Sequence, residues 1–76
     1  MSCFHWTTNK NAQRILEEGL NIYSFIAPYS FLFSGEVCLK IKYEIDWSKR
    51  TEADTWWQAI THKHVYPCDI ETYILL

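Results

Sequence analysis

The sequence lacks the features that mark a secreted or membrane-bound chain. Its three cysteines, Cys3, Cys38 and Cys68, are odd in number and have no repeated spacing, which argues against an internally paired disulfide scaffold. No apolar run approaches the roughly 20 residues that cross a bilayer. The first four residues also lack the basic and apolar regions of a signal peptide. We therefore expect a cytoplasmic protein that does not associate with membranes.

An excess of positive charge is also absent. Seven Lys and Arg residues stand against nine Asp and Glu residues, and the net charge is −2. Lysine and arginine between positions 40 and 50 alternate with acidic residues, as on an ordinary solvated surface. Binding to a phosphate backbone requires a basic patch. We therefore expect no direct binding to nucleic acid.

The chain is short and rich in aromatic residues. Its 76 residues contain no internal repeat, low-complexity segment or linker, so residues 1–76 are interpreted as a single domain. A domain of this size buries only about 60% of the surface of its unfolded chain. Aromatic residues make up 17% of the chain, and their rings are hard to enclose completely. We expect the surplus aromatic surface to bind a protein partner, with self-association as a second form of pairing.

One amphipathic helix is predicted near the N-terminus. Thr8 or Asn9 can cap its start, and apolar residues follow at the spacing of one helix face. Gly19 can take the left-handed conformation that ends a helix. The pattern predicts a helix over Asn9–Glu18.

Strands are predicted on both sides of this helix. The clearest is Glu36–Asp46, in which apolar residues alternate with charged residues and Cys38. Shorter strands are predicted over Cys3–Trp6, Trp56–Thr61 and Ile70–Leu76, and a helix over residues 55–61 is the alternative for the third. The fold class is α+β, with one N-terminal helix packed on a small, mostly antiparallel sheet.

The segment between the helix and the clearest strand contains Pro28. Because proline cannot donate to a strand ladder, Ile22–Tyr29 is interpreted as irregular. Ser34 and Gly35 offer a tight turn, which predicts a hairpin between Phe31–Phe33 and the strand that follows.

One stretch resembles a known family. The residues concerned are Phe4-His5-Trp6-Thr7-Thr8, followed by Ala12, Ile15, Leu16, Gly19 and Leu20. They are similar to the opening of ADP-ribosyltransferase-like proteins, in which a strand ends in a His-x-Thr element and a helix follows. The resemblance implies that His5 and Thr7 contact the ribose of NAD at a helix N-terminus, which suits an anionic ligand.

The same resemblance bears on catalysis. If the protein is an enzyme, His5 is one catalytic residue, and Glu71 is the candidate for the family's late-strand glutamate. The region that carries the family's nicotinamide clamp is nearly absent here, and Trp6 stands where glycine is common. We therefore predict no turnover of NAD and no cofactor, with NAD as the alternative. A second interpretation of His5 is a strand-end histidine bonded to a backbone group, with Thr7 or Thr8 as a cap.

Histidine and cysteine provide one further constellation. His62 and His64 could form a metal site with Cys68 or Cys3. No Cys-x-x-Cys pair supports it, so no metal is predicted and two exposed loop histidines are the simpler interpretation. For a Cys–His nucleophilic pair, nothing in the sequence orients the groups.

The densest aromatic cluster follows an acidic stretch. Trp47 and Trp56 lie near Glu52 and Asp54, and these four residues are predicted to bind the partner. If the segment is a strand, one of Trp56 and Trp57 faces away from the core. The alternative places Trp57 in the core and Trp56 over neighbouring side chains.

The sequence thus favours binding over catalysis. The preferred interpretation is a small non-catalytic protein that acts stoichiometrically on a protein partner, of the kind that phages use to inhibit host defence or host enzymes. The alternative is a minimal NAD-dependent ADP-ribosyltransferase or NAD-binding domain. A third class is a small subunit or a toxin–antitoxin component.

Overall fold

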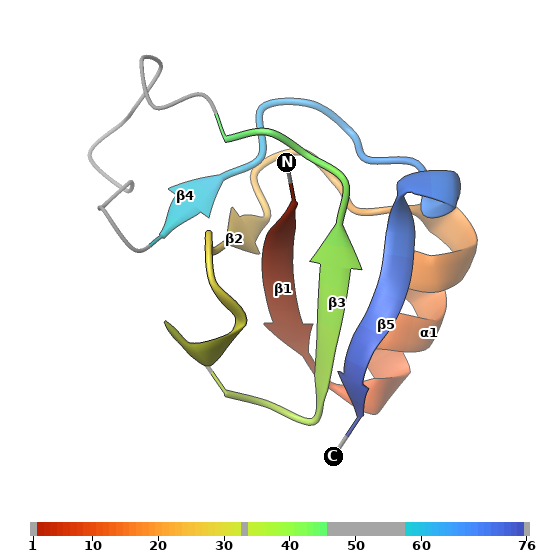
Figure 1. The fold of residues 1–76 in the computed structure, drawn as a ribbon. Helices are drawn as coiled ribbons and strands as arrows, with labels where there is room; N and C mark the ends of the chain where they lie inside the picture. Colours follow the sequence, from red (N-terminus) through yellow and green to blue (C-terminus); the bar gives the residue numbers. More distant parts are fainter. Residues whose placement is uncertain (1, 33, 46–57, 76) are drawn as a thin grey trace.

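The computed structural model describes residues 2–32, 34–45 and 58–75. It confirms an α+β fold with antiparallel strands (Figure 1). The elements in chain order are β1 (Cys3–Thr7), α1 (Asn9–Glu18), β2 (Phe25–Ile26), the 3-10 helix η1 (Ser30–Leu32), β3 (Val37–Ile41), β4 (Ala59–Ile60), the 3-10 helix η3 (Pro67–Asp69) and β5 (Ile70–Leu75).

The five described strands form two small sheets. The larger has the order β1-β3-β5, and both of its pairings are antiparallel. The smaller pairs β2 with β4. The sheets meet where Phe4 and Ala27 exchange two backbone hydrogen bonds of 2.8 Å each. Helix α1 lies across one face of the larger sheet, and within the described part of the chain no α-helix covers the opposite face (Figure 1).

Both ends of α1 follow the sequence signals. Thr8 caps the start, and its hydroxyl oxygen accepts a hydrogen bond of 3.2 Å from the Asn11 amide. Gly19 adopts a φ of 94°, and its amide donates to the Ile15 carbonyl at 2.7 Å. A Cβ at Gly19 would lie 2.4 Å from the Val65 carbonyl oxygen, so this position requires glycine for space as well as for conformation. The predicted helix is confirmed residue for residue.

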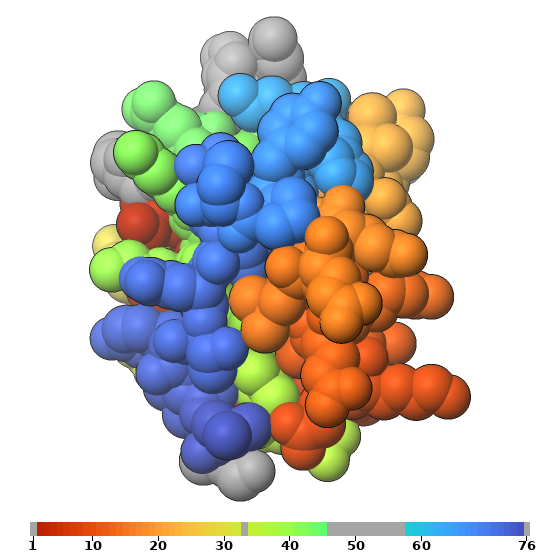
Figure 2. Space-filling view, turned by 90° about the vertical axis from the view of Figure 1, so that its right-hand side faces the viewer, coloured from red at the N-terminus to blue at the C-terminus, as the bar shows by residue number. Residues whose placement is uncertain are grey.

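The core lies between α1 and the larger sheet. Its buried members come from the five described strands, from α1 and from connecting segments: Cys3, Ala12, Leu20, Ile26, Val37, Leu39, Ile41, Tyr43, Ala59, Val65 and Ile70. The central strand β3 contributes three of them, because it has a neighbour on each side and α1 on one face. The space-filling view shows α1 and β5 side by side over this layer (Figure 2).

The burial of Cys38 contradicts the prediction that one face of this strand is exposed. The alternation predicted Cys38 on the same face as the charged residues, yet its side chain is fully buried. Across the β1–β3 pairing Cys38 lies opposite Trp6. The indole N–H of Trp6 donates to the Ser30 carbonyl at 2.7 Å, which joins β1 to η1 at this part of the face. A residue that alternation alone would expose is therefore buried on the central strand, between Trp6 of β1 and Ile74 of β5.

Two predictions for this region, a strand boundary and a hairpin, were wrong. The strand predicted over Glu36–Asp46 is shorter, and β3 ends at Ile41 because the Tyr43 amide turns back to the Ile41 carbonyl at 2.9 Å. The predicted hairpin is absent from the described residues. Ser30–Leu32 form a 3-10 helix instead, and β3 pairs with strands from the two ends of the chain.

The remaining predictions for the strands and the segment before them were confirmed in part. The segment Ile22–Tyr29 was predicted as irregular, but Phe25 and Ile26 form β2; Pro28 follows outside the strands, as predicted. Of the predicted strand Trp56–Thr61, Ala59–Ile60 form β4, and residues 56 and 57 lie outside the described part. Strand β5 confirms the predicted C-terminal strand over Ile70–Leu75.

Within the described residues, α1 is the one α-helix and has ten residues. No helix in this part of the chain is long and apolar enough to cross a membrane.

Candidate binding surface

His5 is held by a hydrogen bond that fixes its protonation pattern. The residue lies in β1, and its Nδ1 is 2.5 Å from the Phe25 carbonyl oxygen. Because a carbonyl oxygen can only accept, Nδ1 carries the proton. Nε2 of the neutral ring is then an acceptor. The backbone partner expected by the second interpretation of His5 is therefore present.

Burial also sets the charge of this ring. Desolvation lowers the pKa of His5 below its usual value, and the hydrogen bond to Phe25 opposes that shift only in part. A histidine with a lowered pKa is neutral at pH 7. His5 thus offers one donor, already used, and one acceptor, rather than a positive charge.

His5 and Thr7 line one groove, as the resemblance implied for a nucleotide site. The groove runs between β1 and α1 and has a volume of ≈ 190 Å³. Its other lining residues are Asn11, Arg14, Ile15, Glu18, Gly19, Leu20, Asn21 and Ser24. Pockets that enclose a drug-sized ligand measure about 300–1,000 Å³. By itself this groove is too small to enclose a dinucleotide.

Glu71 lies away from His5. In the sheet Phe4 pairs with Lys40, and Lys40 pairs with Glu71, so these three residues share the face opposite α1. His5, on the outer strand β1, lines both the groove beside α1 and the hollow shared with Phe4 and Trp6, and Glu71 lines neither of them. Glu71 instead lines a hollow of ≈ 420 Å³ beside Lys40 and Lys42, together with Ser2, Cys68, Asp69 and Ile70. The structure does not bring the two candidate catalytic residues together.

The three cysteines are free and sit in different environments. Cys3 is fully buried, and burial raises the pKa of its thiol to about 12. Burial also raises the pKa of Cys38. Both thiols are therefore protonated and unreactive at neutral pH. Cys68 is exposed.

The other two histidines have structural contacts. Nε2 of His64 lies 3.1 Å from the Glu18 carbonyl, at the C-terminal end of α1. The backbone amide of His62 donates to the Tyr43 hydroxyl at 3.0 Å. Among residues 2–32, 34–45 and 58–75, no group of three or more His, Cys, Asp or Glu side chains is placed to hold a metal ion.

All four residues predicted to bind the partner lie outside the described part of the structure. They are Trp47, Glu52, Asp54 and Trp56. Their role therefore stays a prediction.

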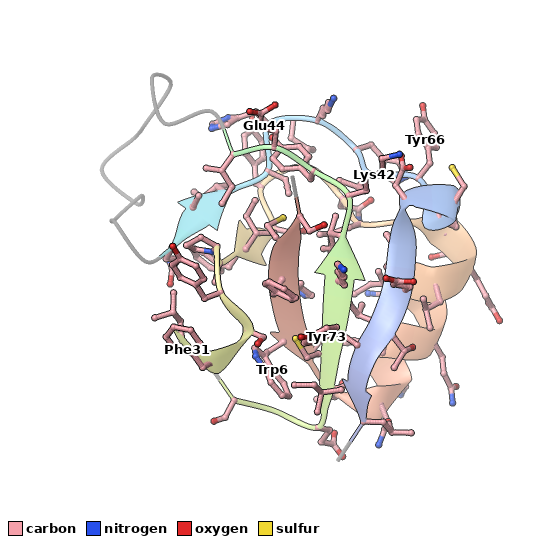
Figure 3. The ribbon with its side chains drawn as sticks, viewed as in Figure 1. Trp6, Phe31, Lys42, Glu44, Tyr66 and Tyr73 are labelled. Atoms are coloured by element: carbon pink, nitrogen blue, oxygen red, sulfur yellow. The ribbon has the colours of Figure 1, made fainter. Side chains whose placement is uncertain are left out.

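The face of the larger sheet opposite α1 carries an aromatic surface that does not include the four residues predicted to bind the partner. We call it the aromatic face and define it by six rings: Phe4, Trp6, Phe25, Tyr29, Phe31 and Tyr73. Figure 3, in which α1 lies behind the sheet, shows Trp6, Phe31 and Tyr73 on the near side. Four of the six rings are more than half exposed.

Contacts join these rings into one surface. The Phe4 and Tyr73 ring centroids are 5.1 Å apart, although these residues come from β1 and β5. Tyr29 and Phe31 stack at 5.4 Å, with an angle of 14° between their planes. The bond from Trp6 to the Ser30 carbonyl links this pair to β1. The aromatic face is thus continuous from β5 to η1.

One signal in the sequence could have found this surface. Residues 21–35 contain no Asp, Glu, Lys or Arg, yet Phe25 is 54% exposed, Tyr29 55% and Phe31 78%. An uncharged stretch of this length is typical of the core, but exposed rings without charge are typical of an interface centre.

The aromatic face is hollowed at one place. Phe4, Trp6 and Phe25 line this hollow with His5, Ser34 and Gln58, and its volume is ≈ 240 Å³. Hot spots in protein interfaces are commonly pockets of this kind, filled by one anchor side chain of the partner.

Comparison with known proteins adds no further constraint. Neither the family models, nor the curated proteins, nor the solved structures that were searched gave a match to this chain.

Proposed function

We propose that this protein acts by binding a protein partner stoichiometrically, without catalysis, through the aromatic face. The observation that carries the proposal is the continuous set of exposed rings on the sheet face opposite α1. Aromatic residues are enriched at the centres of interfaces, where they contribute large contact areas at low cost in side-chain entropy. Residues in the helix-side core cannot serve this purpose, because they are buried.

The geometry of the candidate enzyme residues also supports binding over catalysis. His5 on β1 and Glu71 on β5 are separated by the central strand β3 and line different hollows, and the His5 Nδ1 is already bonded to Phe25. A general acid or base must reach the reacting group within hydrogen-bonding distance. An inhibitor of the kind that phages deploy inside a host cell would need a surface but no such catalytic pair.

Affinity capture with matched variants tests the proposal. The wild-type protein, Phe31→Ala and Tyr66→Ala are each immobilised and exposed to a lysate of the cell in which the protein is produced, which for a phage protein is the host, and retained proteins are identified by mass spectrometry. Phe31 belongs to the aromatic face, whereas Tyr66 is similarly exposed, at 65%, but lies outside it. We expect one protein to be retained by the wild type and by Tyr66→Ala but lost with Phe31→Ala.

The purified partner then gives the stoichiometry. Sedimentation velocity of the mixture should show a complex of fixed composition. Equal retention by all three proteins, or a partner that is consumed rather than held, would contradict the proposal. If the partner is a second copy, sedimentation of the protein alone will show it.

An NAD-binding domain is the second candidate, and one observation favours it. His5 and Thr7, which the resemblance pairs at the ribose, line one groove. Incubation with labelled NAD and a lysate tests transfer, and titration with unlabelled NAD followed by NMR tests binding. Shifts confined to the groove without label transfer would support nucleotide binding alone. Label transfer abolished by His5→Ala or Glu71→Ala would overturn the non-catalytic proposal.

A further inference from the structure

The hollow in the aromatic face has an unusual combination of groups. Among the residues that the structure describes, its lining consists of Phe4, Trp6, Phe25, His5, Ser34 and Gln58, none of which carries a charged acidic or basic group. Its volume of ≈ 240 Å³ lies below the roughly 300–1,000 Å³ of pockets for drug-sized ligands. The size therefore suits one side chain of a partner better than a whole cofactor.

Three of the lining residues are aromatic, and the faces of aromatic rings carry partial negative charge. A cation placed over such a face is attracted to it, most strongly where water is excluded. The protein already uses this attraction elsewhere: Lys40 Nζ lies 5.9 Å from the Tyr73 ring centroid, and Lys63 Nζ lies 5.7 Å from that of Tyr43. Within residues 2–32, 34–45 and 58–75, no lysine or arginine side chain lines the hollow itself.

The polar groups of the lining include acceptors that suit a cationic donor. Because Nδ1–H of His5 donates its hydrogen bond to the Phe25 carbonyl oxygen, Nε2 of the neutral ring is an acceptor. Its lowered pKa keeps the ring uncharged at pH 7. Gln58 provides an amide oxygen, and Ser34 provides a hydroxyl group that can also accept. An apolar side chain would leave these acceptors without partners, whereas a guanidinium group offers five N–H donors.

We propose that this hollow binds the guanidinium group of an arginine side chain of the partner protein. The inference rests on the proposed function and names the chemistry of its anchor. Arginine suits the site better than lysine, because its planar group stacks on aromatic rings and is more weakly hydrated. Arginine is also among the residues most enriched at interface hot spots. The net charge of −2 favours the approach of a basic segment.

Binding of a single side chain tests this directly, without the partner. The ¹⁵N-labelled protein is titrated with N-acetyl-arginine methylamide and, separately, with N-acetyl-leucine methylamide, and amide shifts are followed by NMR. We expect saturable shifts in the millimolar range for the arginine probe, confined to the residues around Phe4, His5 and Phe25. The leucine probe should shift the same amides much less.

Two variants of the same chemical type provide the control. Phe25→Leu removes a ring that lines the hollow, whereas Phe31→Leu removes an exposed ring of the aromatic face outside it. Phe25→Leu should weaken binding of the arginine probe by roughly tenfold, as expected for a lost cation–π contact. Phe31→Leu should leave it unchanged. The dispersion of the amide spectrum reports directly that each variant is folded.

The outcomes separate this inference from the proposed function. Preference for the leucine probe would overturn the arginine anchor and leave the aromatic face as an apolar docking surface. Shifts at another surface, or equal losses for the two variants, would also overturn it. If the arginine probe binds here but no partner is lost with Phe31→Ala, the anchor site stands and the proposed function fails.

Discussion

The two faces of the three-stranded sheet are built from different kinds of side chain. The face toward α1 is aliphatic and closed: Val37, Leu39 and Ile41 are no more than 2% exposed. The opposite face is aromatic and partly open, with Tyr73 51% and Phe31 78% exposed. Small branched side chains fill a narrow layer at high density, whereas large rings on an open face leave area for a partner. This difference is the basis of our proposal that one face stabilises the fold and the other binds the partner.

Leu39→Ala is expected to have the largest effect on stability. The side chain is fully buried on the central strand, next to α1 and between two neighbouring strands. Truncating a buried leucine typically costs about 2–5 kcal/mol, much of which comes from the cavity that remains. Natural domains have only about 5–15 kcal/mol in total. Urea unfolding should show a large loss of stability or an unfolded variant, and a loss below about 1 kcal/mol would contradict the assignment of the aliphatic face.

Gly19→Ala is expected to have the second largest effect on stability, and it tests how α1 is held on that face. A Cβ at this position would lie 2.4 Å from the Val65 carbonyl oxygen and 2.5 Å from His64 Nε2. The positive φ adds a conformational cost of about 1–2 kcal/mol for a residue with a Cβ. We expect a loss of at least that size in the free energy of unfolding, measured by denaturant titration. Gln13→Ala, at an exposed position in the same helix, serves as the control and should change stability little.

His5 lies where the two faces meet, and it should make stability depend on pH. Its pKa is lower in the folded protein than in the unfolded chain, where it is near 6.5. The unfolded state therefore binds more protons between these two values, and stability rises with pH there. The contribution is complete above about pH 6.5 and is lost as the pH falls through the folded pKa.

The matching variant isolates this contribution from that of other groups. His5→Gln keeps a side-chain donor for the Phe25 carbonyl but cannot titrate. The wild type should lose more stability than His5→Gln between about pH 7 and pH 5. Parallel pH profiles of the two proteins would mean that the His5 ring is not desolvated.

The helix-side face was largely predictable from the sequence, because its signals are local. These signals depend only on residues a few positions apart in the sequence. They are the cap at Thr8, the stop at Gly19 and the alternation in β3. The neighbours of β3 were not predictable in this way. The turn signal at Gly35 favoured a partner close in sequence, but in the structure β3 pairs with β1 and β5, which come from the two ends of the chain.

The aromatic face was less predictable, because distant contacts assemble it. The ring contact between Phe4 and Tyr73 joins β1 to β5, and Trp6 reaches the Ser30 carbonyl in a segment with no regular spacing. His5 and Thr7 were predicted together and do share a groove, since both point to one side of a single strand. Glu71 could not be placed relative to them without the register across β3.

Phe31→Ala should have the smallest effect on stability and the sharpest effect on recognition. The ring is 78% exposed, and its described aromatic contact is the stack with Tyr29. Changes at such exposed positions usually stay within about 0.5 kcal/mol, and the loss of an exposed stack fits that range. At the centre of an interface the same truncation costs roughly 2 kcal/mol or more, because water is excluded from the ring. Thermal unfolding of the variant and titration against the captured partner measure the two quantities. A loss of several kcal/mol in unfolding would mean that Phe31 is part of the core, and the division between a stabilising face and a recognising face would then fail. An unchanged affinity with an unchanged melting temperature would contradict the proposal that the partner binds the aromatic face.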